Sequence, residues 1–160
     1  METAEQDHSM MSLALEEAER AYDEGEVPVG AVLTFGEDII ACGHNRSISL
    51  SDPTAHAEIL TLRMAGERRG NYRLSGATLY VTLEPCLMCA GAILQARLTR
   101  LVFGAFDPKA GAVATLYQVL QDERLNHFVE ITGGVHKERC GKILSRFFRE
   151  KRVIAPIDSG

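Results

Sequence analysis

The chain has 160 residues, 46% hydrophobic and 24% charged, a balance typical of one folded water-soluble domain. Its formal net charge of −5 excludes a uniformly basic nucleic-acid coat protein but not a local basic patch. Four cysteines are too few for a disulfide scaffold of this size, so we interpret them as thiols or metal ligands. The N-terminus lacks a secretory signal pattern and no apolar run is long enough to span a membrane, so we expect a cytoplasmic protein.

Charge is unevenly distributed along the chain. Residues 1–26 contain nine acidic residues and one arginine, whereas residues 137–152 contain seven basic residues and two acidic ones. We therefore expect an acidic N-terminal face and a basic C-terminal helix. Taken alone, the charges are equally consistent with two solvated helix faces.

The first predicted elements are a helix and a hairpin. Ser9 is a candidate N-cap for a helix that reaches about Tyr22 and ends at Gly25. Apolar residues recur along it at helical spacing. Residues 29–35 and 39–44 have the pattern of two strands joined by a tight turn, which predicts an antiparallel hairpin.

Helices and strands then alternate. We expect helix 55–65, strand 78–83, helix 86–97, strand 101–106, a short helix near 116–120, strand 129–132 and a closing helix 136–152. This order predicts a three-layer α/β/α sandwich with a mixed five-stranded sheet. The last two strands are joined through a helix and should be parallel. We expect a single domain over residues 1–160, with a core at about 9–152 and short flexible termini.

Pro85-Cys86-Leu87-Met88-Cys89 is the first segment that carries chemistry. Proline suits the first turn of a helix, and Cys86 and Cys89 then share one helix face. The positive end of the helix dipole favours thiolates, and two thiolates on one face suit a cation. A redox pair and a chance surface pair are the alternatives; a redox pair normally occurs in a thioredoxin-like context.

His56 and Glu58 form the second such segment. His56 would complete a His-Cys-Cys donor set suited to Zn²⁺, leaving a fourth position for water, as in catalytic zinc sites. Glu58 could then move protons to and from that water, although a first-turn acid can also simply complement the helix dipole. A structural zinc site would need a fourth ligand, for which the candidates are Cys42, His44 and Cys140.

The His56-x-Glu58 and Pro85-Cys86-x-x-Cys89 segments together match the zinc-dependent cytidine and adenosine deaminases. Over about residues 9–152 the chain further resembles the bacterial tRNA-specific adenosine deaminases. The segments that carry this resemblance are 26–31, 45–46, 52–58, 71–73, 77–86, 89–92, 102–105, 107–111 and 147–149. The resemblance implies a cytidine-deaminase-like fold.

The resemblance also implies an activity. The family converts adenosine to inosine at the wobble position of a tRNA anticodon and releases ammonia. In that mechanism zinc-bound hydroxide attacks C6 of a flipped adenine while a glutamate shuttles protons. By the match, Glu58 is the shuttle, and His56, Cys86 and Cys89 hold one Zn²⁺ per subunit.

The resemblance assigns further residues to the base pocket. Asn45 would hydrogen-bond the purine, although from the residues alone it is a loop asparagine in a turn. Val27 and Pro28 would form an apolar wall, although they are otherwise only the entry to a strand. The remaining pocket residues implied are Ala57, Leu83 and Glu84, the last two through backbone groups.

The substrate should be an unpaired loop with its target base splayed out, such as a tRNA anticodon stem-loop. The resemblance implies RNA contacts by Asn71, Asp107, Lys109, Ala112, Phe147, Phe148 and Arg149. We expect one of the two phenylalanines to pack against the sheet instead. Small residues at 90–96 would allow close helix packing, and the family resemblance implies a homodimer.

Two other functions remain open at this stage. One is a deaminase of a free base or nucleoside, such as guanine, cytosine or cytidine, with the same zinc chemistry. The other is a non-enzymatic zinc module used for binding. The acidic net charge weighs against RNA. The loop 107–111 and the basic C-terminal helix favour it, because a small-substrate enzyme needs neither.

Overall fold

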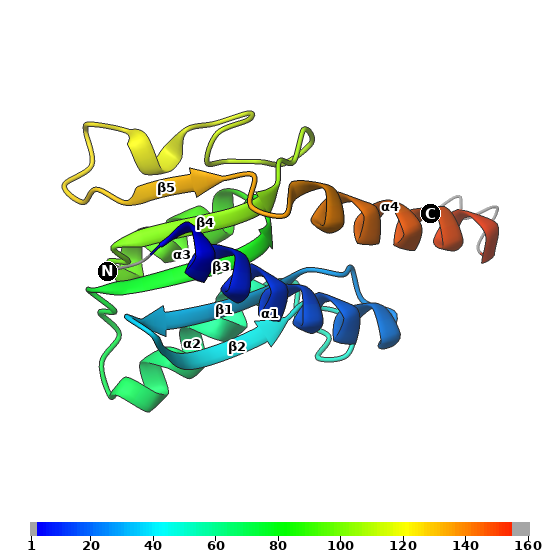
Figure 1. Ribbon diagram of the computed structural model, residues 1–160, viewed down its shortest axis with the longest axis horizontal. Helices are drawn as coiled ribbons and strands as arrows, with labels where there is room; N and C mark the ends of the chain where they lie inside the picture. Colours follow the sequence, from blue (N-terminus) through cyan, green and yellow to red (C-terminus); the bar gives the residue numbers. More distant parts are fainter. Residues whose placement is uncertain (1–2, 155–160) are drawn as a thin grey trace.

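A mixed five-stranded sheet is the middle layer of the computed structural model, which describes residues 3–154 (Figure 1). In spatial order its strands are β2 (Asp38–His44), β1 (Gly30–Phe35), β3 (Ala77–Leu83), β4 (Arg100–Ala105) and β5 (Glu130–Gly133). Strand β1 is antiparallel to both β2 and β3, whereas β3, β4 and β5 are mutually parallel. The predicted hairpin and the predicted parallel pairing of the last two strands are both confirmed.

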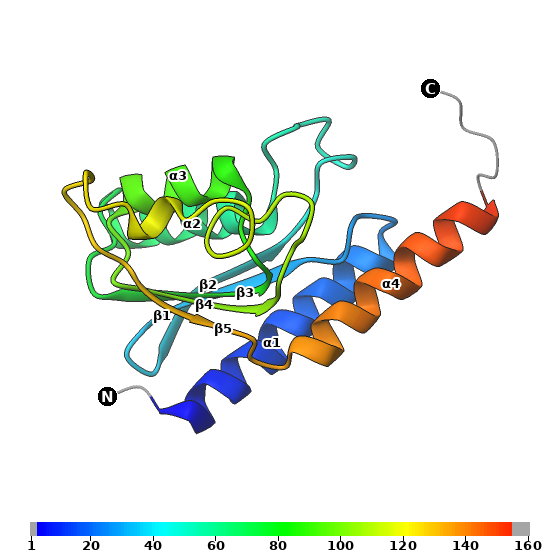
Figure 2. The ribbon, with the colours of Figure 1, turned by 90° about the horizontal axis from the view of Figure 1, so that it is seen from above.

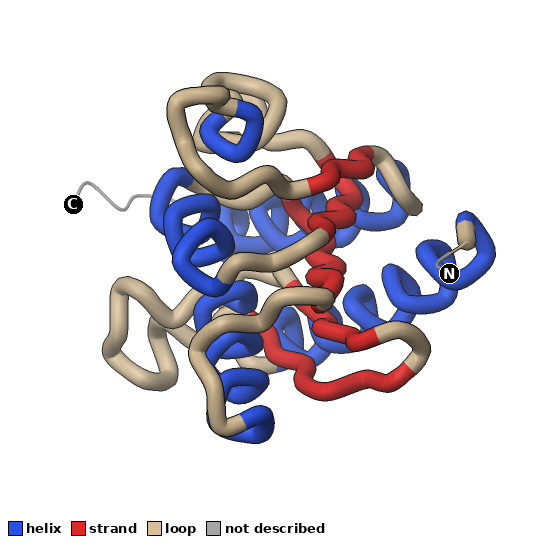
Figure 3. The backbone as a smooth tube through the Cα atoms, turned by 90° about the vertical axis from the view of Figure 1, so that its left-hand side faces the viewer, coloured by secondary structure: helices blue, strands red, loops and turns tan. Residues whose placement is uncertain are grey.

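Two helices cover each face of the sheet. Helices α1 (Ala4–Asp23) and α4 (Lys137–Ile154) lie on one face, and α2 (Ala57–Arg69) and α3 (Leu87–Ala96) lie on the other (Figure 2). Seen along its length in Figure 3, the sheet is a column of strands with helices on either side. The predicted three-layer α/β/α sandwich is therefore confirmed.

Strand β3 contributes to two hydrophobic cores. Leu79 and Val81 are buried in the core that includes residues of α2 and α3, whereas Tyr80 between them is buried in the core that includes residues of α1. Successive side chains of a strand point to opposite faces, so a strand covered on both sides has an almost continuous apolar sequence. This is why residues 78–83 contain no acidic or basic residue.

Helix α1 begins earlier than predicted. Its N-cap is Thr3, whose hydroxyl accepts a hydrogen bond from the Gln6 amide at 3.1 Å, so the assignment of Ser9 as the cap was wrong. The extra turn carries Asp7, a buried carboxylate that accepts two hydrogen bonds of 2.7 Å from Arg100 of β4. This tertiary ion pair fixes the start of the helix on the sheet, and no local sequence signal reports it.

The segment between β4 and β5 also differs from the prediction. The short helix expected near residues 116–120 is a single 3-10 turn, η1 (Val119–Gln121). The rest of the segment is loop and turn. Its backbone groups bond to neighbouring parts of the fold, as when the Ala112 amide donates to the Pro85 carbonyl at 2.9 Å, so they do not form a continuous helix.

The acidic and basic segments of the sequence lie side by side. Helices α1 and α4 cross the same face of the sheet (Figure 2). Arg146 of α4 forms a 3.3 Å ion pair with Glu19 of α1, and its guanidinium lies 4.2 Å from the ring centroid of Tyr22. Part of the basic charge of α4 is therefore compensated within the molecule.

The described part of the chain contains no helix with the length and hydropathy of a membrane span. The flexible termini expected from the sequence fall partly on residues 1–2 and 155–160, which lie outside the described residues.

Replacing Gly30 by alanine should destabilise the fold. A Cβ at this position would lie 2.0 Å from the Ala14 carbonyl oxygen and 2.5 Å from the Ala18 amide nitrogen, so the backbone of α1 would have to move. We expect Gly30→Ala to lower the free energy of unfolding by about 1–3 kcal/mol in urea denaturation. The control is Gly141→Ala in α4, where a Cβ meets nothing within 4 Å, and where a gain of about 0.5–1 kcal/mol is expected. Equal urea midpoints for Gly30→Ala and the unsubstituted protein would contradict this packing.

Candidate active site

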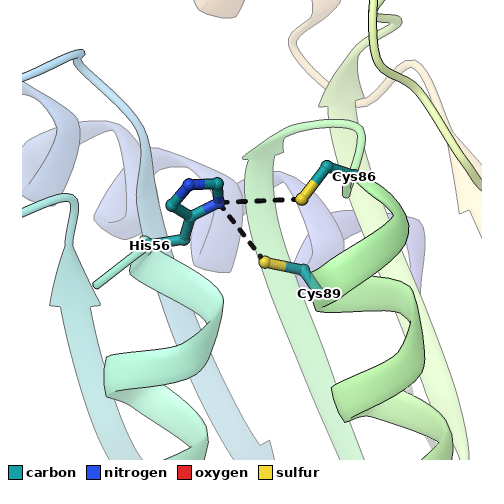
Figure 4. Close-up of side chains that lie close together, drawn as sticks. All are labelled: His56, Cys86 and Cys89. Atoms are coloured by element: carbon teal, nitrogen blue, oxygen red, sulfur yellow. Dashed lines mark hydrogen bonds between the residues drawn. The ribbon is translucent and has the colours of Figure 1, made fainter. Parts of the chain in front are cut away.

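His56, Cys86 and Cys89 form a compact cluster where helices α2 and α3 begin (Figure 4). His56 Nδ1 lies 3.7 Å from Cys86 Sγ and 3.6 Å from Cys89 Sγ. In a tetrahedral zinc site, bonds of about 2.3 Å to sulfur and 2.0 Å to nitrogen place those two atoms about 3.5 Å apart. The observed separations therefore fit a zinc ion held by this predicted donor set.

The ends of two helices position these side chains. His56 is the N-cap of α2 and Cys86 is the N-cap of α3, yet neither side chain forms a capping hydrogen bond. Asn45 acts in place of His56, because its Oδ1 accepts a hydrogen bond of 2.7 Å from the Ala57 amide. The imidazole is thus not needed as a helix cap, and both helix dipoles direct their positive ends to the cluster.

Hydrogen bonds among the three side chains shift their pKa values in directions that favour binding of a cation. Hydrogen bonds from Cys89 and then His56 lower the pKa of Cys86 to about 3. The pKa of the Cys89 thiol is raised, mainly by its hydrogen bond to Cys86 and secondly by its burial. The hydrogen bond to Cys86 likewise raises the pKa of His56. One thiolate is therefore stabilised by a neighbouring thiol, and a divalent cation would displace that proton and bind both sulfurs.

The cluster has no fourth protein donor among residues 3–154. None of the three candidate fourth ligands lies in it. His44 bonds through its two ring nitrogens to Glu17 and Glu24 at 2.9 and 3.1 Å. Cys42 belongs to β2, and Cys140 is buried on α4. A three-donor site leaves a coordination position for a reacting molecule, as in catalytic zinc sites.

Glu58 is in the first turn of α2, two residues beyond His56, and its side chain is buried. Burial raises the pKa of Glu58 to about 7, against the opposing effects of its own backbone amide and His56. A carboxyl group that titrates near neutrality can both accept and donate a proton during a reaction. An acid that only complemented the helix dipole would remain solvated and ionised, so burial favours the proton-transfer role.

A cleft of about 990 Å³ lies between the loop after β4 and helix α4. It contains predicted residues from four separate parts of the chain: Val27, Leu83, Asp107, Lys109, Phe148 and Arg149. Val27 and Leu83 were predicted as base-pocket residues and the other four as RNA contacts. The structure thus brings two of the six predicted base-pocket residues and four of the seven predicted RNA contacts into one surface, whereas Pro28, Asn45, Ala57 and Glu84 do not line this cleft.

Three predicted RNA contacts do not reach this surface. Asn71 follows the far end of α2, a 13-residue helix about 20 Å long, whereas His56 precedes its start. Ala112 is fully buried. Phe147 is 7% exposed and packs edge-to-face on Tyr22, whereas Phe148 is 44% exposed. Of the two phenylalanines, Phe147 is therefore the one that packs inside the fold.

Two buried glutamates were not recognised from the sequence as loop anchors. The Glu26 carboxylate accepts hydrogen bonds from the amides of Ile48 and Ser49, and Glu84 accepts several from the loop after β4. Burial opposes ionisation of both, but these hydrogen bonds outweigh it and lower both pKa values. An acidic residue flanked by apolar ones, as in Leu83-Glu84-Pro85, was the available signal.

Comparison with known proteins agrees with this geometry. A family model for MafB19-like deaminases matches residues 5–152. A tRNA-specific adenosine deaminase of Bacillus subtilis (strain 168) is 52% identical over 92% of this chain and 91% of its own length. A solved structure from a study of A-to-I editing by tRNA:A34 deaminases has a TM-score of 0.82 at 47% identity, covering 85% of this chain and 99% of its own. A guanine deaminase from Nitrosomonas europaea shares the fold, with a TM-score of 0.77 at 23% identity over 88% of this chain and 83% of its own.

Removing either cysteine of the cluster should remove the metal. Purified Cys86→Ser and Cys89→Ser proteins are expected to contain less than about a tenth of the zinc of the unsubstituted protein, because a hydroxyl is a poor zinc ligand. Cys42→Ser is the matched control and should keep its zinc. Elemental analysis measures the zinc content of each protein, and circular dichroism checks that each variant is folded. Full zinc content in both cluster variants would refute the ligand assignment.

Proposed function

The chain belongs to the tRNA-specific adenosine deaminase family, and from this membership we propose that it hydrolyses adenosine to inosine at the wobble position of a tRNA anticodon. Water is consumed and ammonia is released. The observation that carries the proposal is the His56-Cys86-Cys89 cluster with the buried Glu58 beside it. The family relationship identifies the nucleobase chemistry, and the cleft with its basic residues supports an RNA rather than a free nucleoside.

The proposed chemistry divides between the metal site and Glu58. A zinc ion held by His56, Cys86 and Cys89 supplies a Lewis acid that makes water a nucleophile at neutral pH. Glu58 would take a proton from the attacking water on a carboxylate oxygen and pass it to N1 of the adenine ring, and would then move the proton of the new hydroxyl group at C6 to the leaving amine. A carboxyl pKa near 7 suits both halves of this cycle.

Residues around the cluster would orient the base. Val27, Pro28 and Leu83 supply apolar surface against which a purine can stack and exclude water. The Asn45 oxygen already accepts the Ala57 amide, so the group that Asn45 offers a purine is its Nδ2 donor. Ala57, together with backbone groups of Leu83 and Glu84, completes the proposed base pocket.

The cleft favours an RNA loop as substrate. A flipped base would leave its neighbouring nucleotides outside the pocket, where they need a surface of their own. Lys109 and Arg149 supply positive charge for phosphates, and the half-exposed Phe148 supplies an aromatic face. A free base or nucleoside would use none of these residues.

We also propose that two copies of the chain associate through the outer face of α2 and α3. A hollow there is lined largely by apolar groups and by the small residues Ala92 and Ala96. Tyr72 on its edge is 68% exposed. Small residues allow two such helix faces to approach closely. The RNA contact assigned to Asn71 would then come from the second copy, because Asn71 is remote from the cleft of its own chain.

Glu58→Gln tests the proposed function directly. With an anticodon stem-loop RNA carrying A34, the zinc-loaded protein should form inosine and ammonia in equal amounts. The variant should keep its zinc, but its kcat should fall by a factor of about 10²–10⁴, because glutamine cannot exchange protons. The exposed Glu37→Gln is the matched control and should retain activity. Turnover of free bases or nucleosides but not of the stem-loop would favour the rival deaminase, and full activity of Glu58→Gln would refute the role of Glu58.

Lys109→Ala and Arg149→Ala test the proposed RNA surface. Each should weaken stem-loop binding and reduce the slope of log Kd against log salt by about 0.7, the value for one phosphate contact to a single strand. Zinc content should not change. Binding assays at several salt concentrations measure the slope. If both variants have the slope of the unsubstituted protein, these two residues do not contact RNA phosphates and the RNA binds another face.

A further inference from the structure

Glu84 lies between β3 and α3, two residues before the metal-cluster residue Cys86, and it is 2% exposed. Its carboxylate reaches residues 107–115, which we call the anchored loop. Oε1 accepts a hydrogen bond of 3.0 Å from the Asp107 amide and another from the Thr115 hydroxyl. Oε2 accepts hydrogen bonds from the amides of Val113, Ala114 and Thr115 at 3.1, 2.8 and 2.9 Å.

The anchored loop is packed tightly around this carboxylate. A Cβ at Gly111 would lie 2.4 Å from Glu84 Cδ, so only glycine fits at that point. The next residue, Ala112, donates its amide to the Pro85 carbonyl at 2.9 Å. One side chain and one neighbouring carbonyl of the β3–α3 junction therefore hold the beginning, middle and end of the loop.

The chemistry of the site requires a carboxylate. Every group that meets its two oxygens is an N–H or O–H donor, and charge-assisted hydrogen bonds of this kind are stronger than neutral ones. A glutamine would direct an NH₂ group at backbone donors in either orientation. The anchored loop has no strand or helix of its own, so the amides of residues 113–115 depend on this acceptor.

We infer that Glu84 is a positioning residue for the RNA substrate: its carboxylate fixes the anchored loop relative to helix α3, which carries Cys89, and so sets the distance between the RNA-contacting residues and the reacting base. The inference rests on the proposed function. Asp107 and Lys109 stand on this loop and line the cleft. A preformed loop avoids the cost of ordering it when RNA binds. The Glu84 carboxylate is engaged by the anchored loop, and only the backbone of Glu84 belongs to the proposed base pocket.

Glu84→Gln, assayed with the zinc-loaded protein, separates this role from a catalytic or merely structural one. Hydrogen–deuterium exchange at the Val113, Ala114 and Thr115 amides should become at least about tenfold faster as their hydrogen bonds to a charged acceptor are lost. KM for the stem-loop RNA should rise about tenfold while kcat stays within about threefold, since the cluster and Glu58 are unchanged. Zinc content should stay constant.

Glu26→Gln is the matched control for exchange, because Glu26 is an equally buried carboxylate that accepts the amides of Ile48 and Ser49 instead. It should speed exchange at those two amides and leave residues 113–115 unchanged. Two further variants keep the inference testable if Glu84→Gln does not fold. Thr115→Val removes one donor and Gly111→Ala displaces the carboxylate, so both should raise KM, with Thr115→Val giving the smaller rise.

The outcomes separate the inference from the proposed function. Unchanged exchange at residues 113–115, or a fall in kcat at constant KM, would overturn the role of Glu84 even if the unsubstituted protein edits the stem-loop. Failure of the unsubstituted protein to convert the stem-loop would overturn the proposed function, and with it the role of Glu84 in RNA binding. Faster exchange together with a raised KM supports the inference.

Discussion

The whole arrangement depends on holding one imidazole nitrogen within 3.7 Å of two sulfurs that lie thirty or more positions further along the chain. The sheet makes this possible, because α2 and α3 lie on one face with their N-termini at the same end (Figure 2). The burial of Glu58 follows from the same placement. A small shift of either helix would change the donor spacing and the environment of that carboxyl together, so fold stability and chemistry are coupled here.

Electrostatic compensation between helices reconciles an acidic protein with an RNA substrate. The acidic α1 neutralises part of α4 through the Arg146–Glu19 pair. Lys109 and Arg149 line the cleft instead, and Arg149 also borders the hollow between α1 and α4 that contains Glu19 and Arg146. The net charge of the chain therefore says little about RNA binding, because the local charge at the RNA surface depends on which basic side chains remain exposed after the helices have packed.

Much of the fold and the metal centre could be predicted from the sequence because their signals are local. Short apolar runs bounded by turn residues mark the strands, and the Pro85-Cys86-x-x-Cys89 and His56-x-Glu58 spacings mark the metal donors and the nearby acid. The failures share a different cause. The first turn of α1 is held on the sheet by Asp7 meeting Arg100, ninety-three positions away, and the course of residues 107–115 depends on Glu84. Ala112 and Phe147 were assigned to RNA contacts by resemblance, and their burial cannot be derived from a motif.

The way Glu84 holds its loop has a consequence for how such an enzyme can change over generations. Most of the hydrogen bonds to the Glu84 carboxylate come from main-chain amides, which every residue except proline provides. The path of the loop is therefore nearly independent of the exposed side chains it displays at 108–110. Mutation can exchange those side chains, and with them the nucleotide context that is tolerated, without disturbing the metal ligands. Selectivity and reaction chemistry can thus diverge separately on one scaffold.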